Sequence, residues 1–390
     1  MNHCDENAIL DELSSFSIKK VPDNTQFWMV RTKGGYFYDE FLSKQFVALA
    51  WNNITKETSF SDENKDAIID DILLQYEEIK RPTTVINKCR IFIEDINEGD
   101  ILLIPNKGSS LITFAFAGSY YEEEGKSVAL EKAVIDKIEH GDIHISDVSC
   151  PYKKRRHITP IKTVRAEHLN IHLYKSITNY HGLSNFNQYA FQILDQLYPC
   201  YTYTNDVRIV FHVNKPDPIG PRELSRLLYG AIDSLSMVTD ETSISTQLAL
   251  QSEGDVAFYL RNAYEILDAS KVFLIGLVVL LGGGSFLSVK LPGVPQIIKD
   301  FLNIGTETAL KREELKKAEL ENESRRIENV RKLLDLENQL RKDGIDKNKL
   351  IRNLDDIVQS CQSMQIHPTE NVVFIPSEIT DQEPGEYDES

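Results

Sequence analysis

The stretch that decides the fold of this chain is Phe27 to Trp51, FWMVRTKGGYFYDEFLSKQFVALAW. Apolar and polar residues alternate on both sides of Gly34-Gly35, and this pattern predicts two strands joined at a glycine turn. The last five residues, Val47 to Trp51, are apolar and predict a buried strand. A second stretch, Arg90 to Pro105 (RIFIEDINEGDILLIP), predicts a tight Gly-Asp turn that leads into a core strand over residues 101–104. We therefore expect a β-rich domain in this part of the chain.

These residues resemble the PUA-like superfamily and, within it, the EVE-like modules found beside Mrr-type restriction nucleases. The resemblance covers residues 20–175 and departs from the family at Ala50, where a glycine is usual. The shared pattern begins with an aromatic-Trp-x-Val-Arg opening (Phe27–Arg31), a Gly-Gly-Tyr step (Gly34–Tyr36) and a Val-Ala-Leu-Ala-Trp strand (Val47–Trp51). It continues with a Gly-Asp turn (Gly99–Asp100), an Ala-Gly-Ser-Tyr segment (Ala117–Tyr120) and a basic block (Tyr152–Arg156).

The resemblance implies a small, closed β-barrel whose mouth binds a base or a nucleotide, including modified, flipped or single-stranded ones. Stacking on an aromatic wall contributes about 1–3 kcal/mol per base, and a nearby carboxylate or backbone group reads the edge of the base. The candidate ligand-binding residues are Trp28, Arg31, Tyr36, Trp51 and Asp100. The residue types leave a second interpretation open, in which both tryptophans belong to the core and the aspartate only forms the turn.

A dense basic block, Lys153-Lys154-Arg155-Arg156-His157, follows later in the chain. The formal net charge of the protein is −17, so attraction to phosphate requires a local positive cluster of this kind. Lys153, Lys154, Arg155 and Arg156 are therefore candidates for phosphate contact, and the two arginines offer a bidentate fork. The alternative is a solvated edge strand whose lysines prevent pairing with other sheets.

Length and composition predict two or three folded domains, since 390 residues are 41% hydrophobic and 26% charged. The five cysteines are widely spaced and form no C-x-x-C pair, which predicts reduced thiols and no zinc ribbon. The nearest match to the acidic-x-Lys pair of an Mrr-type nuclease, Glu78-Ile79-Lys80, falls in the predicted helical run Asp66 to Lys80. We therefore expect no enzyme activity, no metal site and no cofactor.

The region after residue 175 is expected to contain four further segments. Residues 176–255 predict a small α/β module with a helical face over Asn185 to Tyr198, a buried strand over Val207 to Val213 and a helix that begins at Pro221. The other three segments are residues 256–293, which are apolar, residues 294–364, which predict a long charged helix and a shorter one, and residues 365–390, which predict a disordered acidic tail.

The apolar segment contains Val272 to Val289, which carries no charged residue and reaches the length of a membrane-spanning helix. The alternative is a buried helix that ends at Gly282-Gly283-Gly284. The following helix carries Leu320, Ile327 and Leu334 at heptad spacing, which predicts self-association into a homo-oligomer.

The expected fold class is α+β, with an N-terminal PUA/EVE-like β-barrel, a small α/β middle module, a C-terminal apolar helix and a long amphipathic helix. We predict a non-enzymatic sensor-effector of bacterial anti-phage defence, similar in architecture to membrane effectors of such systems. It would bind a nucleotide or nucleic acid and control an oligomeric helical region in the inner membrane, with a cytoplasmic N-terminal domain. The alternative is a soluble cytoplasmic nucleic-acid-binding adaptor, a modified-base reader that recruits a separate nuclease or ATPase partner encoded in the same operon.

Overall fold

The computed structural model describes residues 19–31, 33–141, 148–180, 182–213, 218–236, 244–250 and 254–260, and scattered residues between 352 and 367. Contacts group them into two compact units, Thr25–Ala190 and a second unit that combines the residues before 25 with those from Phe191 onward. The predicted apolar run and the heptad seam lie outside the described residues, and so does the predicted acidic tail apart from Ile366–His367, which forms a short strand. Among the helices that are described, none is long and apolar enough to span a bilayer.

The fold is mixed α+β, as predicted, and the Thr25–Ala190 unit is built on one six-stranded sheet in the order β3-β6-β5-β4-β2-β7. Strands β2 and β4 are parallel and the other neighbours are antiparallel. The sheet curls into an open half-barrel, whereas the resemblance implied a closed barrel. The strands are β2 (Phe27–Arg31), β3 (Phe46–Leu49), β4 (Ile101–Pro105), β5 (Leu111–Glu122), β6 (Lys154–Arg165) and β7 (Gly182–Asn185).

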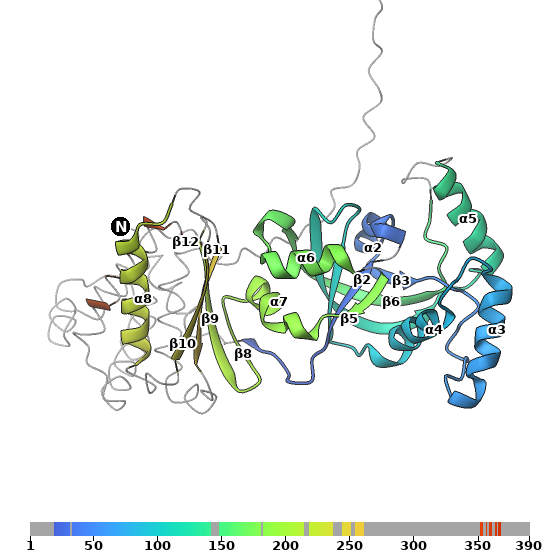
Figure 1. The fold of residues 1–390 in the computed structure, drawn as a ribbon, viewed down its shortest axis with the longest axis horizontal. Helices are drawn as coiled ribbons and strands as arrows, with labels where there is room; N and C mark the ends of the chain where they lie inside the picture. The colour runs from blue at the N-terminus through green and yellow to red at the C-terminus, as the bar shows by residue number, and fades with distance from the viewer. Residues whose placement is uncertain are drawn as a thin grey trace, which may run out of the picture. The chain divides into compact units, whose positions relative to one another are not determined.

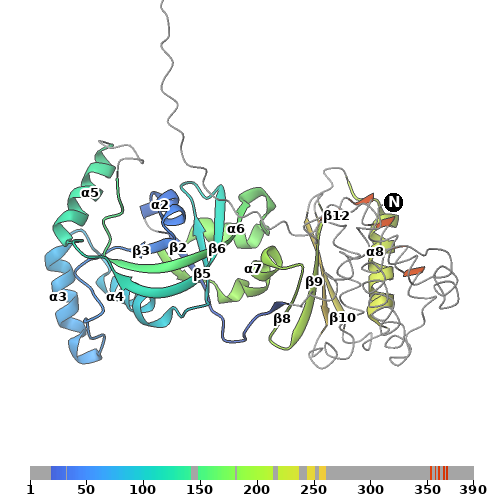
Figure 2. The same cartoon turned by 180° about the vertical axis from the view of Figure 1, so that it is seen from behind.

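Helices cover both faces of this sheet, and α3 and α6 lie on opposite sides of it (Figures 1 and 2). Alternation along β2 directs Trp28 and Val30 to one face and Phe27 and Met29 to the other, and all four are buried. The helices are α2 (Tyr38–Ser43), α3 (Lys65–Gln75), α4 (Pro82–Arg90), α5 (Val128–His140) and α6 (Ile171–Asn179). Short helical turns are η1 (Lys33–Gly35), η2 (Asp62–Asn64), η3 (Ile91–Asp95), η5 (Ala166–His168) and η6 (Asn187–Tyr189).

The predictions for the two core strands are confirmed as β3 and β4, although β3 ends at Leu49, before Trp51. The prediction of a second strand after the glycine turn is wrong, because that segment forms α2. Phe37 and Phe41 are four residues apart, and a helix places both on one face, where they are buried with ring centroids 6.3 Å apart. The unit also continues past residue 175 to Ala190, since β7 pairs with β2.

Gly34 and Gly35 differ in what surrounds them, although both adopt a positive φ. A Cβ on Gly35 would lie 2.5 Å from the carbonyl carbon of Asn106 and 2.6 Å from the nitrogen of Lys107, whereas a Cβ on Gly34 would have no neighbour within 4 Å. The turn between β2 and α2 therefore packs directly against the backbone of the loop between β4 and β5. Only a residue without a side chain allows that approach.

Gly35→Ala should consequently destabilise the Thr25–Ala190 unit by about 1–3 kcal/mol more than Gly34→Ala, because only the first substitution forces two backbones apart. Both variants carry a similar conformational cost from the left-handed φ, so Gly34→Ala is the matched control. Urea unfolding followed by tryptophan fluorescence measures the difference, since both tryptophans belong to this unit. Equal midpoints for the two variants would contradict the close packing.

The second unit contains a sheet in the order β1-β8-β9-β11-β10, with β12 paired to β9. Helix α8 begins at Pro221, as predicted, and the predicted buried strand over residues 207–213 is confirmed as part of β9. In both views α8 lies along one face of this sheet (Figures 1 and 2). The elements are β1 (Lys19–Lys20), α7 (Ala190–Leu197), β8 (Cys200–Tyr203), β9 (Asp206–Val213), α8 (Pro221–Leu235), β10 (Ile244–Leu250), β11 (Gly254–Leu260) and β12 (Ile366–His367).

Candidate ligand-binding site

Trp28 and Asp100, two of the candidate ligand-binding residues, are bonded to each other inside the Thr25–Ala190 unit. Trp28 is 6% exposed and donates its indole N–H to Asp100 Oδ2 over 3.0 Å. Asp100, 3% exposed, also accepts the backbone N–H groups of Gln26 (3.0 Å) and Asn97 (2.9 Å). The carboxylate therefore ties the start of β2 to the turn before β4. The geometry favours the interpretation in which the indole belongs to the core and the aspartate forms the turn.

Lys154 of the basic block is fully buried, at 0% exposure. Its ammonium donates to the carbonyl oxygens of Trp51 (2.5 Å) and Ile54 (2.9 Å). The alternative interpretation of the block as a solvated edge strand is wrong, because β6 lies between β3 and β5 and is paired on both sides. An interior strand places its side chains against the core, and the buried ammonium finds acceptors in the loop that follows β3.

The neighbouring residues Arg155 and Arg156 also form hydrogen bonds within the protein. Arg155 donates to the carbonyl oxygens of Tyr152 (3.2 Å) and Cys150 (3.1 Å), and its guanidinium lies 4.2 Å from the Phe46 ring centroid. Arg156 donates to three carbonyl oxygens, those of Phe92 (2.9 Å), Gly118 (3.0 Å) and Ile93 (3.1 Å). Lys153 Nζ pairs with Glu122 Oε2 at 3.2 Å. These contacts favour a structural role for the whole block, and phosphate contact by it stays a prediction.

Trp51, in contrast, is half-buried and lies just beyond the end of β3 with φ at +68°. A left-handed conformation is unfavourable for a bulky residue and persists only where the surroundings enforce it. Here the backbone N–H of Trp51 donates to Glu131 Oε1 (2.9 Å), and its carbonyl accepts from Lys154 Nζ and from the backbone N–H of Ile54 (3.0 Å). Two buried charged side chains, from α5 and β6, therefore hold this tryptophan.

Glu131 is a buried carboxylate in the first turn of α5 and organises the segment Trp51–Ile54. Its Oε2 accepts the backbone N–H of Asn52 (2.9 Å) and the hydroxyl of Tyr76 (2.7 Å), and that hydroxyl also accepts from Asn52 N (3.0 Å). Burial and the adjacent carboxylate raise the pKa of Tyr76, so the phenol remains a donor. The segment is thus fixed by a network of buried polar groups, which is rigid when all members are satisfied.

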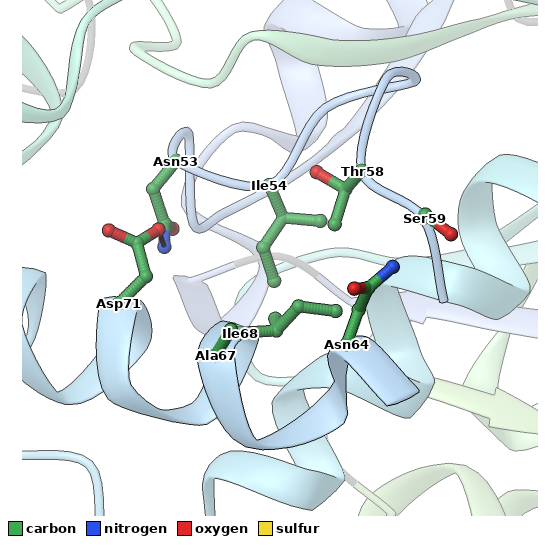
Figure 3. A pocket seen from close by; sticks show the side chains of 8 residues that line it. All are labelled: Asn53, Ile54, Thr58, Ser59, Asn64, Ala67, Ile68 and Asp71. Atoms are coloured by element: carbon green, nitrogen blue, oxygen red, sulfur yellow. Dashed lines mark hydrogen bonds between the residues drawn. The ribbon is translucent and has the colours of Figure 1, made fainter. Parts of the chain in front are cut away.

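An open pocket of about 220 Å³ lies beside this segment (Figure 3). Asn53 donates to Asp71 Oδ2 over 2.9 Å, while its own Oδ1 is buried and accepts no hydrogen bond among the described residues. The volume is below the about 300–1,000 Å³ of ordinary ligand pockets, so it suits a single ring or base. Eight residues line it, namely Asn53, Ile54, Thr58, Ser59, Asn64, Ala67, Ile68 and Asp71.

Arg31 and Tyr36 lie at the end of β2, where the loop between β4 and β5 meets them. Arg31 Nη2 donates to Ser109 Oγ, and Lys107 Nζ lies 5.9 Å from the centroid of the Tyr36 ring. The candidate residues thus fall into three separate arrangements: a core pair at the start of β4, a strained tryptophan after β3, and a cationic group at the end of β2.

The sequence did not point to Glu131, Asn53, Lys107 or Ser109. Lys107-Gly108-Ser109 follows a predicted core strand and has the composition of a turn. That composition predicts a loop but does not indicate that the loop contacts Arg31. Glu131 had no signal of its own, because an acidic residue in the first turn of a helix is ordinary. Comparison with protein-family models, with curated proteins and with solved structures finds no match for the chain.

Proposed function

We propose that the Thr25–Ala190 unit is a PUA/EVE-like reader of a nucleotide or nucleic acid, and that the base is bound at Trp51 and the adjacent pocket. The observation that carries the proposal is the strained, half-buried Trp51, which buried charges hold in a fixed conformation. Such strain in a structure suggests a functional requirement for that conformation. The pocket beside it supplies the Asn53 amide oxygen, which accepts no hydrogen bond from the described residues, and the Asp71 carboxylate, and both groups can read the edge of a base.

Fluorescence of Trp51 alone tests this proposal. Trp28→Phe leaves Trp51 as the only tryptophan, and nucleoside monophosphates and short single-stranded DNA and RNA are then titrated into the full chain. Stacking should quench the Trp51 emission saturably, and Asn53→Ala should weaken binding about tenfold by removing an edge contact. Asn97→Ala, an exposed asparagine elsewhere in the unit, is the matched control. If no ligand changes the Trp51 emission, the proposal that a base binds at Trp51 is wrong.

The wider role remains the sensor-effector of bacterial anti-phage defence, in which ligand binding stabilises one of two assemblies of an oligomeric, membrane-inserting C-terminal region. The soluble adaptor is its alternative. Fractionation of the full chain beside a version that lacks Val272–Val289, with carbonate-washed membranes, separates the two. Membrane retention of the full chain alone supports the effector, and recovery of both versions in the soluble fraction supports the adaptor.

A further inference from the structure

A cationic group gathers where the parallel strands β2 and β4 end. The loop between β4 and β5 reaches the turn after β2, because Gly35 lets the two backbones touch. This contact brings together four side chains that we name the Arg31 cluster: Arg31, Tyr36, Lys107 and Ser109. In open α/β sheets, ligands bind outside the carboxyl ends of parallel strands, and β2 and β4 are the one parallel pair in this otherwise antiparallel described sheet.

Arg31 is the centre of the cluster, and the described residues satisfy its hydrogen-bond donors only in part. One guanidinium nitrogen, Nη2, donates to the hydroxyl of Ser109, whereas Nε is buried and has no partner among the described residues. Nor does any described carboxylate form an ion pair with Arg31. A guanidinium removed from water without an anion is costly, and proteins ordinarily pair such groups. Burial lowers the pKa of Arg31, and Tyr174 acts in the opposite direction, which fits a cation that lacks a strong anionic neighbour.

Arg208 of the second unit gives an internal comparison. Its Nε also has no partner in the described part of the chain, but its Nη2 pairs with Asp195 Oδ2 at 2.6 Å, so the charge is compensated. Arg155 likewise pairs with a carboxylate, Glu123, at 3.4 Å. Arg156 donates from Nε, Nη1 and Nη2 to three backbone carbonyl oxygens. Arg31 is half-buried, and it thus differs from these buried arginines in having a hydroxyl acceptor and no compensating carboxylate among the described residues.

Lys107 adds a second positive charge on the exposed side of the cluster. It is exposed and forms no ion pair with the part of the chain that the structure describes. Its ammonium lies beside the face of the Tyr36 ring, which attracts the cation but carries no net charge. The positive charge of Lys107 therefore adds to the positive potential of the cluster. Ser109 is buried in a left-handed conformation, with φ at 58°, and thereby holds its hydroxyl against Arg31.

We propose that the Arg31 cluster binds a phosphate group, with the Arg31 guanidinium as the fork, the Lys107 ammonium as the second charge and Ser109 as the residue that orients the fork. Arginine suits this role because planar N–H groups match phosphate oxygens in pairs. The phosphate can belong to a nucleotide or to a nucleic-acid backbone. The site goes beyond the proposed base reading and does not rest on it, because Trp51 is not part of the cluster.

Isothermal titration calorimetry on the full chain tests the site with three probes: inorganic phosphate, AMP and a short single-stranded oligonucleotide. Arg31→Gln should raise the Kd about tenfold to a hundredfold, because charge-assisted hydrogen bonds are lost. Lys107→Ala should raise it about threefold to tenfold. The matched controls, Arg90→Gln and Lys44→Ala, each remove the same type of charged side chain elsewhere in the unit. Arg90 forms an ion pair with Asp95, and Lys44 forms one with Glu40.

Equal affinity for phosphate and AMP would assign the site to a terminal phosphate, and tighter, salt-dependent binding of the oligonucleotide would assign it to a backbone. No binding of any probe, or equal affinity of Arg31→Gln and Arg90→Gln, would overturn the proposal. If Arg31→Gln does not fold, Lys107→Ala against Lys44→Ala decides the question, since the side chain of Lys107 is exposed. Inorganic phosphate should leave Trp51 emission unchanged, so the anion site and the base site can fail separately.

Discussion

Lys154→Met should destabilise the Thr25–Ala190 unit by about 3–5 kcal/mol, the range expected when one member of a buried charged network is removed. The methionine would leave the carbonyl groups of Trp51 and Ile54 without their buried donor. It would also leave the Glu131 carboxylate without the nearby positive charge. Burial lowers the pKa of Lys154, while Cys89 and Glu131 act in the opposite direction, so the ammonium depends on its surroundings. Urea unfolding followed by tryptophan fluorescence measures the loss.

The adjacent lysine provides the control for this experiment. Lys153→Met removes a half-buried ammonium paired with Glu122, and a pair of that kind contributes at most about 1 kcal/mol. A double-mutant cycle with Glu131→Gln then separates charge compensation from lost hydrogen bonds. The double variant should be more stable than the sum of the two single losses predicts, by about 0.5–3 kcal/mol. Strict additivity, or equal losses for the two lysines, would contradict a shared network.

The strands that the sequence predicted well are those whose apolar runs are flanked by turn residues. Val47 to Leu49 and Ile101 to Ile104 are continuous apolar segments, and a strand buried on both faces requires that pattern. The segment Tyr36–Ser43 was ambiguous, because aromatic residues after a glycine turn suit a strand and Phe37 with Phe41 suits a helix. The helix forms because it alone places both rings in the core.

The basic block shows why charge in a sequence does not decide exposure. Lys154 and Arg156 can be buried because backbone carbonyl groups accept hydrogen bonds from their N–H groups. Those carbonyl groups belong to residues that are between 38 and 103 positions away along the chain. No local pattern encodes acceptors at such separations. The same limit applies to the candidate site, where Arg31 was a candidate by resemblance but its neighbours Lys107 and Ser109 depend on the meeting of two loops.

The role of Asp100 leads to the second large expected effect. Asp100→Asn should destabilise the Thr25–Ala190 unit by about 2–4 kcal/mol. In the wild-type protein three N–H donors share the two carboxylate oxygens of Asp100, whereas the side-chain amide of asparagine offers them only one acceptor oxygen. The NH₂ group would face at least one of them, and a buried donor would lose its partner. Trp28→Phe should cost less, since the carboxylate would keep the backbone groups of Gln26 and Asn97.

Asp95→Asn is the matched control, because that carboxylate lies near the same turn, is partly exposed and has Arg90 as its one ion-pair partner among the described residues. Its loss should stay below about 1 kcal/mol. The comparison also tests whether Asp100 reads a ligand. If Asp100→Asn unfolds as easily as the wild-type protein and instead abolishes nucleotide binding, the carboxylate contacts the ligand and the core assignment of Trp28 is wrong. A large loss of stability means that the Gly-Asp turn holds β2 against β4, so that the carboxyl ends of these strands meet beside Arg31.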